Sequence, residues 1–123
     1  METILLVDDE AILRRLVRKI LQTHGYTVLE ASRGKDAIQI CQQHEGPIHL
    51  LLTDVTMPEM NGRNLAERVT TLRPHTRVLY MSGYTDGALI TPFGLITPTA
   101  FIQKPFTPDA LTRKVREILS DMR

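Results

Sequence analysis

The chain has 123 residues, of which 42% are hydrophobic and 24% charged, a balance typical of a globular domain that can bury a core. Lys and Arg number 15 against 14 Asp and Glu, so the basic excess that many nucleic-acid binders carry is absent. The apolar runs are too short to cross a membrane, no signal-peptide pattern opens the chain, and a single cysteine, Cys41, excludes an internal disulfide framework. We therefore expect one cytoplasmic domain over residues 1–123, without direct contact to nucleic acid or membrane.

Strands and helices are predicted to alternate along the chain, because short apolar runs are separated by segments of helical periodicity. In chain order the elements are a strand at Thr3–Val7, a helix to about Thr23, a strand at Thr27–Ala31, a helix from about Lys35 to His44, a strand from Leu50 into Asp54, a helix from Asn61-Gly62 to Arg73-Pro74, a strand at Arg77–Met81, an irregular segment, a strand at Ala100–Gln103 and a final helix from Thr107-Pro108.

Several local patterns support these elements. The first helix carries two neighbouring apolar rows at helical spacing: Ile12, Leu16 and Ile20, with Leu13, Val17 and Leu21 beside them. Three consecutive leucines before Thr53 indicate a strand buried on both faces, as in the centre of a parallel sheet. Thr107-Pro108-Asp109 is a strong helix start, with Thr as the N-cap and Pro in the first position.

The segment Thr85–Thr99 is the least regular part of the chain. It contains Pro92, Gly94 and Pro98, and proline in a helix interior removes a hydrogen bond and clashes with the preceding turn. We therefore expect the fourth helix to be short or broken.

Five alternations of strand and helix predict a parallel sheet covered by helices on both faces. The carboxyl ends of parallel strands meet at one edge of such a sheet, where ligands bind. That edge collects the residues that follow the first, third, fourth and fifth strands: Asp8, Asp9, Asp54, Ser82 and Lys104.

These side chains together indicate phosphoryl chemistry. Three adjacent carboxylates repel one another unless a cation neutralises them, and hard oxygen ligands suit Mg²⁺. An ammonium and a hydroxyl beside them could stabilise a phosphoryl group while a carboxylate oxygen attacks it. In the absence of a metal, the acidic loop after the first strand would repel the phosphates of a nucleotide or flavin, and no glycine-rich phosphate-binding motif occurs.

The chain resembles the receiver (response-regulator) domain of two-component signalling over essentially its whole length. The matching stretches are Val7-Asp8-Asp9-Glu10, Thr53-Asp54-Val55-Thr56-Met57-Pro58 with Gly62, Met81-Ser82-Gly83 and Lys104-Pro105-Phe106. The resemblance implies an α/β, flavodoxin-like (βα)5 fold: a doubly wound, five-stranded parallel sheet in strand order 2-1-3-4-5.

The resemblance also implies a role for each site residue. Asp54 would be the phosphoacceptor, Asp9 a direct Mg²⁺ ligand, and Asp8 a ligand acting mainly through water. Thr56 would contribute its backbone carbonyl to the metal, Lys104 would pair with the phosphoryl group, and the Lys104–Pro105 bond would be cis. Ser82 and Phe101 would form the conformational switch, although a simple core aromatic is the alternative reading of Phe101.

The implied function is a phosphoacceptor module that receives a phosphoryl group from a histidine kinase or a histidine phosphotransfer domain and then switches its output face. Such a module is not an enzyme for external substrates, although it assists its own phosphorylation and dephosphorylation. Two alternatives stay open. One is an interaction module independent of phosphorylation. The other is an aspartyl-phosphate hydrolase, which would need a second aspartate where Thr56 stands.

Further expectations concern regulation and partners. The motifs resemble receivers at the C-terminus of hybrid sensor histidine kinases, so the parent protein could itself be a kinase, and the domain would be a monomer or weak dimer. Tyr84 would lie beside the path of the hydrolytic water. The first helix carries a basic row formed by Arg14, Arg15, Arg18 and Lys19. One reading of this row is a solvated surface. The other is a docking surface, since in this family the first helix commonly packs against the histidine donor.

Overall fold

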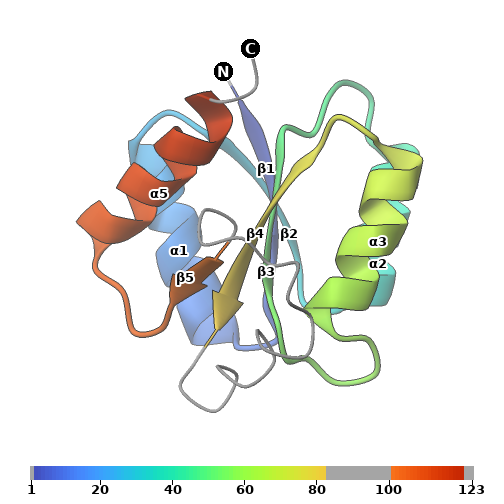
Figure 1. Cartoon of the computed structure of the whole chain (residues 1–123), viewed down its shortest axis with the longest axis horizontal. Coiled ribbons are helices and arrows are strands. Elements are labelled where there is room, and N and C mark those ends of the chain that lie inside the picture. Colours follow the sequence, from blue (N-terminus) through green and yellow to red (C-terminus); the bar gives the residue numbers. More distant parts are fainter. Residues whose placement is uncertain (1, 83–100, 121–123) are drawn as a thin grey trace.

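The computed structural model describes residues 2–82 and 101–120. Figure 1 shows a central sheet with helices on both of its faces. Tyr84 and the segment Thr85–Thr99, where a short or broken fourth helix is predicted, lie outside the described residues.

The described strands form one parallel sheet in the order β2-β1-β3-β4-β5, which confirms the predicted flavodoxin-like topology. The strands are β1 (Thr3–Val7), β2 (Thr27–Ala31), β3 (Leu50–Asp54), β4 (Arg77–Ser82) and β5 (Phe101–Gln103). The helices are α1 (Ala11–Thr23), α2 (Gly34–Gln43), α3 (Gly62–Leu72) and α5 (Pro108–Ser120). Helix α2 begins one residue earlier than predicted and ends one residue earlier.

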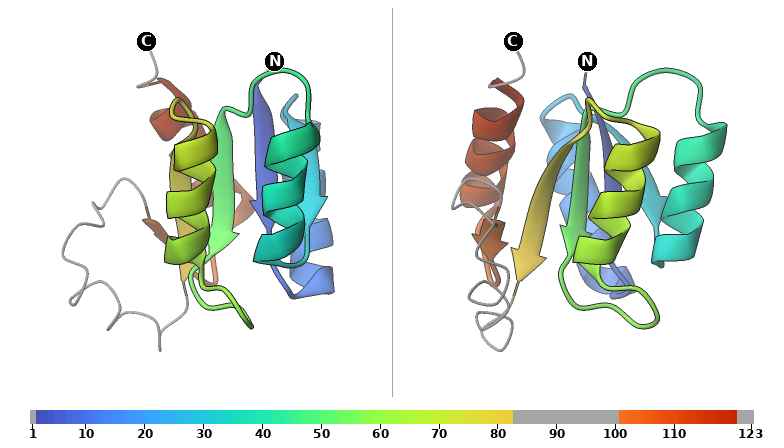
Figure 2. Two further views of the ribbon diagram at one scale, coloured as in Figure 1. Left: turned by 90° about the vertical axis from the view of Figure 1, so that its right-hand side faces the viewer. Right: turned by 45° about the vertical axis from the view of Figure 1, so that its right-hand side comes forward.

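Two apolar cores lie on opposite faces of the sheet, because successive side chains of a strand point to opposite sides. Ile4 and Leu6 of β1 face the core formed with α1 and α5, whereas Leu5 and Val7 face the core formed with α2 and α3. Figures 1 and 2 show the two helix pairs on either side of the strands. All five residues of β3 are buried, as the run of leucines predicts for a central strand.

One of the two apolar rows of α1 lies in the core, whereas the other contacts the core only through Ile20. Val17 and Leu21 are fully buried and Leu13 packs against them. Ile12 and Leu16 of the other row are 84% and 54% exposed. Helix α1 therefore presents an apolar strip to the outside. None of the described helices is both long and apolar enough to span a bilayer.

The interpretation of the basic row on α1 as a solvated surface is wrong for Arg14. Arg14 and Arg18 both form ion pairs with Glu30 of β2, at 3.2 and 2.5 Å. The Arg14 side chain is only 17% exposed. These two arginines join α1 to the edge strand of the sheet.

Helix ends follow local chemistry. The side-chain oxygen of Asn61 accepts a hydrogen bond from the Asn64 amide at the start of α3. Thr107 Oγ1 accepts from the Ala110 amide at 3.1 Å, which confirms the predicted N-cap of α5. Arg73, the residue that follows α3, donates to three backbone carbonyls in the last turn of α2 and just after it, those of Cys41, His44 and Gly46.

Candidate functional site

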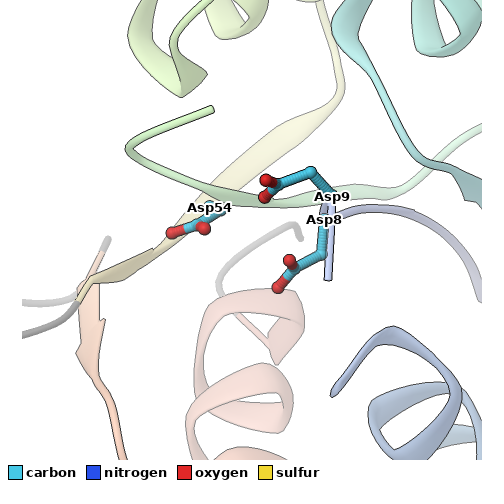
Figure 3. Close-up of side chains that lie close together, drawn as sticks. All are labelled: Asp8, Asp9 and Asp54. Atoms are coloured by element: carbon cyan, nitrogen blue, oxygen red, sulfur yellow. The ribbon is translucent and has the colours of Figure 1, made fainter. Parts of the chain in front are cut away.

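The carboxylates predicted at the edge of the sheet do gather there. Asp8 and Asp9 follow β1 and Asp54 is the last residue of β3. One carboxylate oxygen from each lies within 4.8 Å of the others. Figure 3 shows the three side chains around a common space, Asp8 and Asp9 from one loop and Asp54 from the neighbouring strand.

Lys104 supplies a cation to this cluster from the end of β5. Its Nζ lies 3.2 Å from Asp54 Oδ2 and 3.5 Å from Asp8 Oδ2. Its backbone amide donates to the carbonyl of Ser82 at 2.6 Å, which ties the Lys104 loop to the end of β4. The Lys104–Pro105 bond is cis, as expected.

Asp8 is fully buried, and its two oxygens differ in their surroundings. Oδ1 accepts a hydrogen bond from the Glu10 amide at 2.8 Å. Oδ2 accepts no hydrogen bond within residues 2–82 and 101–120 and has only the longer ion pair with Lys104. Burial of a carboxylate oxygen with so few polar contacts carries a desolvation penalty. A metal ion bound among the three aspartates would offset this penalty.

The electrostatics of the cluster also favour an added cation. Burial raises the pKa of Asp54 to about 6, although the Lys104 ammonium opposes this shift and Asp8 adds to it. Burial likewise raises the pKa of Asp8, against the opposing effects of the Glu10 amide and Lys104. Burial lowers the pKa of Lys104, but the charges of Asp8 and Asp54 outweigh it and the net pKa is raised. One ammonium therefore serves a cluster that would accommodate a further positive charge.

The backbone around Asp54 is held by the sheet and by α3. The Val55 amide donates to the Met81 carbonyl at 2.9 Å, and the Val55 carbonyl accepts from the Gly62 amide at 2.8 Å. A Cβ atom at Gly62 would overlap the carbonyl oxygen of Asp54. The glycine in this motif is thus explained by close approach of the first residue of α3 to the Asp54 backbone.

The remaining predicted site residues occupy positions near the cluster. Ser82 ends β4 and is fully buried. Thr56 is exposed in the loop after β3. Phe101 is partly buried at the start of β5, lies opposite Tyr80 of β4, and packs against the core on the α2–α3 side.

Sequence reasoning missed one residue that contacts the site. Arg14 of α1 donates from Nη1 to the backbone carbonyl of Asp8 at 2.7 Å. In the sequence it is one of several arginines on a helix, and only the packing of α1 against β2 distinguishes it from the others.

Comparison with known proteins agrees with this geometry. The family model for the response regulator receiver domain matches residues 4–116. The response regulator receiver protein CpdR of Brucella abortus is 34% identical over 119 residues, which cover 97% of this chain and 98% of that protein. The sensor kinase CckA of the same organism is 34% identical over 117 residues, 95% of this chain, but the chain spans only 12% of that kinase.

The solved structures lead to the same family. A response regulator receiver protein from Sinorhizobium medicae matches with a TM-score of 0.85 at 28% identity, and the match covers 99% of this chain and 97% of that one. Together with the family match over residues 4–116, it shows that the chain belongs to the response regulator receiver domains of two-component signalling.

Proposed function

We propose that this receiver domain is a phosphoacceptor: Asp54 takes a phosphoryl group from a histidine kinase or a histidine phosphotransfer protein in a Mg²⁺-dependent reaction. The observation that carries the proposal is the position of the Asp54 carboxylate, buried beside Asp8 and Asp9 with the Lys104 ammonium at 3.2 Å. A carboxylate that only caps a turn requires none of these neighbours.

The proposed step is an in-line transfer. An Asp54 carboxylate oxygen attacks the phosphorus, the bond from phosphorus to the donor imidazole nitrogen breaks, and the electron pair of that bond returns to the imidazole. With a pKa of about 6 in the metal-free protein, the carboxylate is mostly ionised at neutral pH, and a bound cation would favour the ionised form further, so the nucleophile is available for attack. Lys104 is placed to stabilise the charge on the transferred phosphoryl oxygens.

The residues present fit a Mg²⁺ ion. Asp9 would bind it directly, Asp8 mainly through water, and Asp54 and the backbone carbonyl of Thr56 would complete the protein ligands. Support comes from the three carboxylate oxygens within 4.8 Å and from the uncompensated Asp8 Oδ2. When bound, the ion would neutralise the carboxylates and the incoming phosphoryl oxygens.

Ser82 and Phe101 would report phosphorylation to the output face. The Ser82 hydroxyl would move toward the phosphoryl oxygens, and the Phe101 ring would turn inward to fill the space left. Their positions support this role, because Ser82 is buried at the end of β4 and Phe101 is only partly buried on the adjacent strand. Such a step shifts an equilibrium between two pre-existing conformations.

The donor would dock on α1 and the loop after β5. An apolar hollow of about 430 Å³ lies there beside Lys104, and the exposed Ile12 extends the apolar strip along α1. The hollow is lined mainly by apolar residues: Leu13, Leu16, Ile20, Pro105, Phe106 and Pro108. A helical histidine donor with an apolar face would cover this strip and bring its phosphohistidine to Asp54.

We further propose that the domain works in the cytoplasm as a monomer or weak dimer without contacting DNA. It would act either alone, as a protein of the length of CpdR, or attached to a histidine kinase, as in the much longer CckA. Its activity would be limited to its own phosphorylation and dephosphorylation.

Incubation with acetyl phosphate and MgCl₂, followed by intact-mass spectrometry, tests the proposal. The wild type should gain the mass of one phosphoryl group, whereas Asp54→Ala, or the wild type in EDTA, should gain none. Asp36→Ala, which removes an exposed carboxylate of α2, is the matched control and should be phosphorylated normally. No added mass in any protein would favour the phosphorylation-independent module, and sustained turnover of acetyl phosphate without a protein adduct would favour a hydrolase.

The docking surface has a separate test. Leu16→Arg should slow transfer from a phosphorylated histidine phosphotransfer domain while leaving phosphorylation by acetyl phosphate unchanged, because the small donor does not need the apolar strip. Equal rates of protein-to-protein transfer for the wild type and Leu16→Arg would contradict the proposed docking mode.

A further inference from the structure

Arg14, near the start of α1, makes contacts in two directions. Its Nη1 donates to the backbone carbonyl of Asp8 at 2.7 Å, and its Nε donates to Glu30 Oε1 at 3.2 Å. Arg18, one turn further along the helix, pairs with the other oxygen of Glu30 at 2.5 Å. The Arg14 side chain is 17% exposed and that of Arg18 38%, so the contacts of Arg14 are better shielded from water.

The contact with Asp8 completes the restraint of both peptide groups around that residue. The Asp8 amide donates to the Ala31 carbonyl of β2 at 3.2 Å, and the Asp8 carbonyl accepts from Arg14. Because peptide groups are planar, these two bonds fix the planes on either side of the Asp8 Cα. The second plane includes the nitrogen and the Cα of Asp9, so it also fixes the point from which the Asp9 side chain extends.

The acidic loop has few other restraints: Lys104 pairs with Asp8 at 3.5 Å, and the Glu10 carbonyl accepts a hydrogen bond from the Arg14 amide at 2.9 Å. Three carboxylates stand in succession at Asp8, Asp9 and Glu10, and they repel one another. Glu10 occupies the N-cap of α1 but makes no side-chain cap hydrogen bond. The hydrogen bond from the Glu10 amide to Asp8 Oδ1 holds the loop only through the side chain of Asp8.

We propose that Arg14 is a positioning residue, which orients the Asp8–Asp9 peptide so that both carboxylates are directed at the Mg²⁺ site, and that Glu30 in turn holds Arg14 in place. The inference rests on the metal site of the proposed function and assigns to that site a residue that is not a ligand. Outer contacts of this kind commonly decide how well first ligands bind a metal.

The sign of the effect separates positioning from simple electrostatics. Removal of a cation beside three carboxylates would by itself strengthen the attraction for a divalent ion, because less positive charge would oppose it. Loss of positioning weakens binding, because the two carboxylates no longer converge. Arg14 and Arg18 both join α1 to Glu30, but the hydrogen bond to Asp8 comes from Arg14, so Arg18 provides a matched control.

The test is a titration of the full chain with MgCl₂ by isothermal calorimetry, at constant ionic strength and without any phosphodonor. Arg14→Met should weaken Mg²⁺ binding roughly tenfold, the lower end of the range for residues that support metal ligands. Arg18→Met should stay within about twofold of the wild type, since exposed ion pairs contribute little. Arg14→Lys, which keeps the charge, should also bind more weakly, because one ammonium does not reproduce a fork of donors to two acceptors.

Several results would overturn the inference. Binding of Mg²⁺ by Arg14→Met as tightly as by the wild type, or more tightly, would leave only the electrostatic effect. Equally weakened Mg²⁺ binding in Arg14→Met and Arg18→Met would show that both arginines act only by joining α1 to β2. Circular dichroism establishes whether each variant is folded. If Arg14→Met does not fold, the Mg²⁺ affinity of Arg14→Lys tests the inference. A wild type that binds no Mg²⁺ would remove the metal site of the proposed function and this inference with it, whereas normal wild-type binding with unaffected Arg14 variants would remove this inference alone.

Discussion

The raised pKa of Asp54 predicts that its carboxylate destabilises the metal-free protein at neutral pH. Its folded-state pKa is about 6 against an ordinary value of 3.8, chiefly because the carboxylate is buried. The folded state therefore binds a proton more tightly than the unfolded state does. Stability consequently falls as the pH rises from the unfolded pKa through the folded one, and the full penalty is present above it.

The size of this penalty follows from the shift. A difference of roughly two pKa units corresponds to about 3 kcal/mol at neutral pH, and less than about 1 kcal/mol remains near pH 4. Asp54→Asn removes the ionisable group at nearly constant shape. In EDTA the variant should therefore be more stable than the wild type by about 2–3 kcal/mol near pH 7.5 and nearly equal to it near pH 4.

Urea unfolding followed by circular dichroism, at several pH values in EDTA, measures this difference. Asp36→Asn, which changes an exposed carboxylate on α2, is the control and should show no such pH-dependent gain. Added MgCl₂ should stabilise the wild type more than Asp54→Asn, because a ligand of the folded state raises stability by mass action. A constant difference between Asp54→Asn and the wild type across this pH range would refute the reasoning about burial of Asp54.

Two further substitutions test the packing around the site and the helices. Gly62→Ala should cost about 1–3 kcal/mol of stability in urea unfolding and should slow phosphorylation by acetyl phosphate, because its Cβ would overlap the Asp54 carbonyl. The control Gly46→Ala, strained at a φ of 101° but without contacts to Asp54, should lose stability without slowing phosphorylation. Equal phosphorylation rates for the wild type and both variants would contradict the role of Gly62. Arg73→Met should lower the free energy of unfolding by about 2–3 kcal/mol, because three carbonyls lose a charged donor. Arg73→Lys should recover only part of this stability. An unchanged stability of Arg73→Met would show that water replaces the guanidinium.

Most of the fold follows from local sequence patterns that can be interpreted without knowledge of tertiary contacts. The leucines of β3 predict a central strand because only a strand covered on both faces needs apolar residues at consecutive positions. The Thr107-Pro108 start of α5 depends on a hydrogen bond three residues away, so the sequence contains all of it. The convergence of Asp8, Asp54 and Lys104 follows once the strands are parallel, because their carboxyl ends then share one edge.

The parts that the sequence did not predict depend on contacts between distant elements. Helical spacing identifies two apolar rows on α1, but it does not tell which row faces the sheet, and Ile12 and Leu16 prove to be outside. The pairing of Arg14 with Glu30 joins residues on α1 and β2, and only their packing brings the guanidinium to the Asp8 carbonyl. The three carbonyl contacts of Arg73 likewise need the ends of α2 and α3 to be adjacent.

The most direct measurement locates the phosphoryl group itself. Wild-type protein is treated with acetyl phosphate and MgCl₂, reduced with borohydride, which converts an acyl phosphate of aspartate to homoserine, and mapped by peptide mass spectrometry. A homoserine at position 54, and at neither Asp8 nor Asp9, is the predicted result. Conversion at Asp8 or Asp9 instead, or no conversion in protein that binds Mg²⁺, would contradict the assignment of Asp54 as the phosphoacceptor.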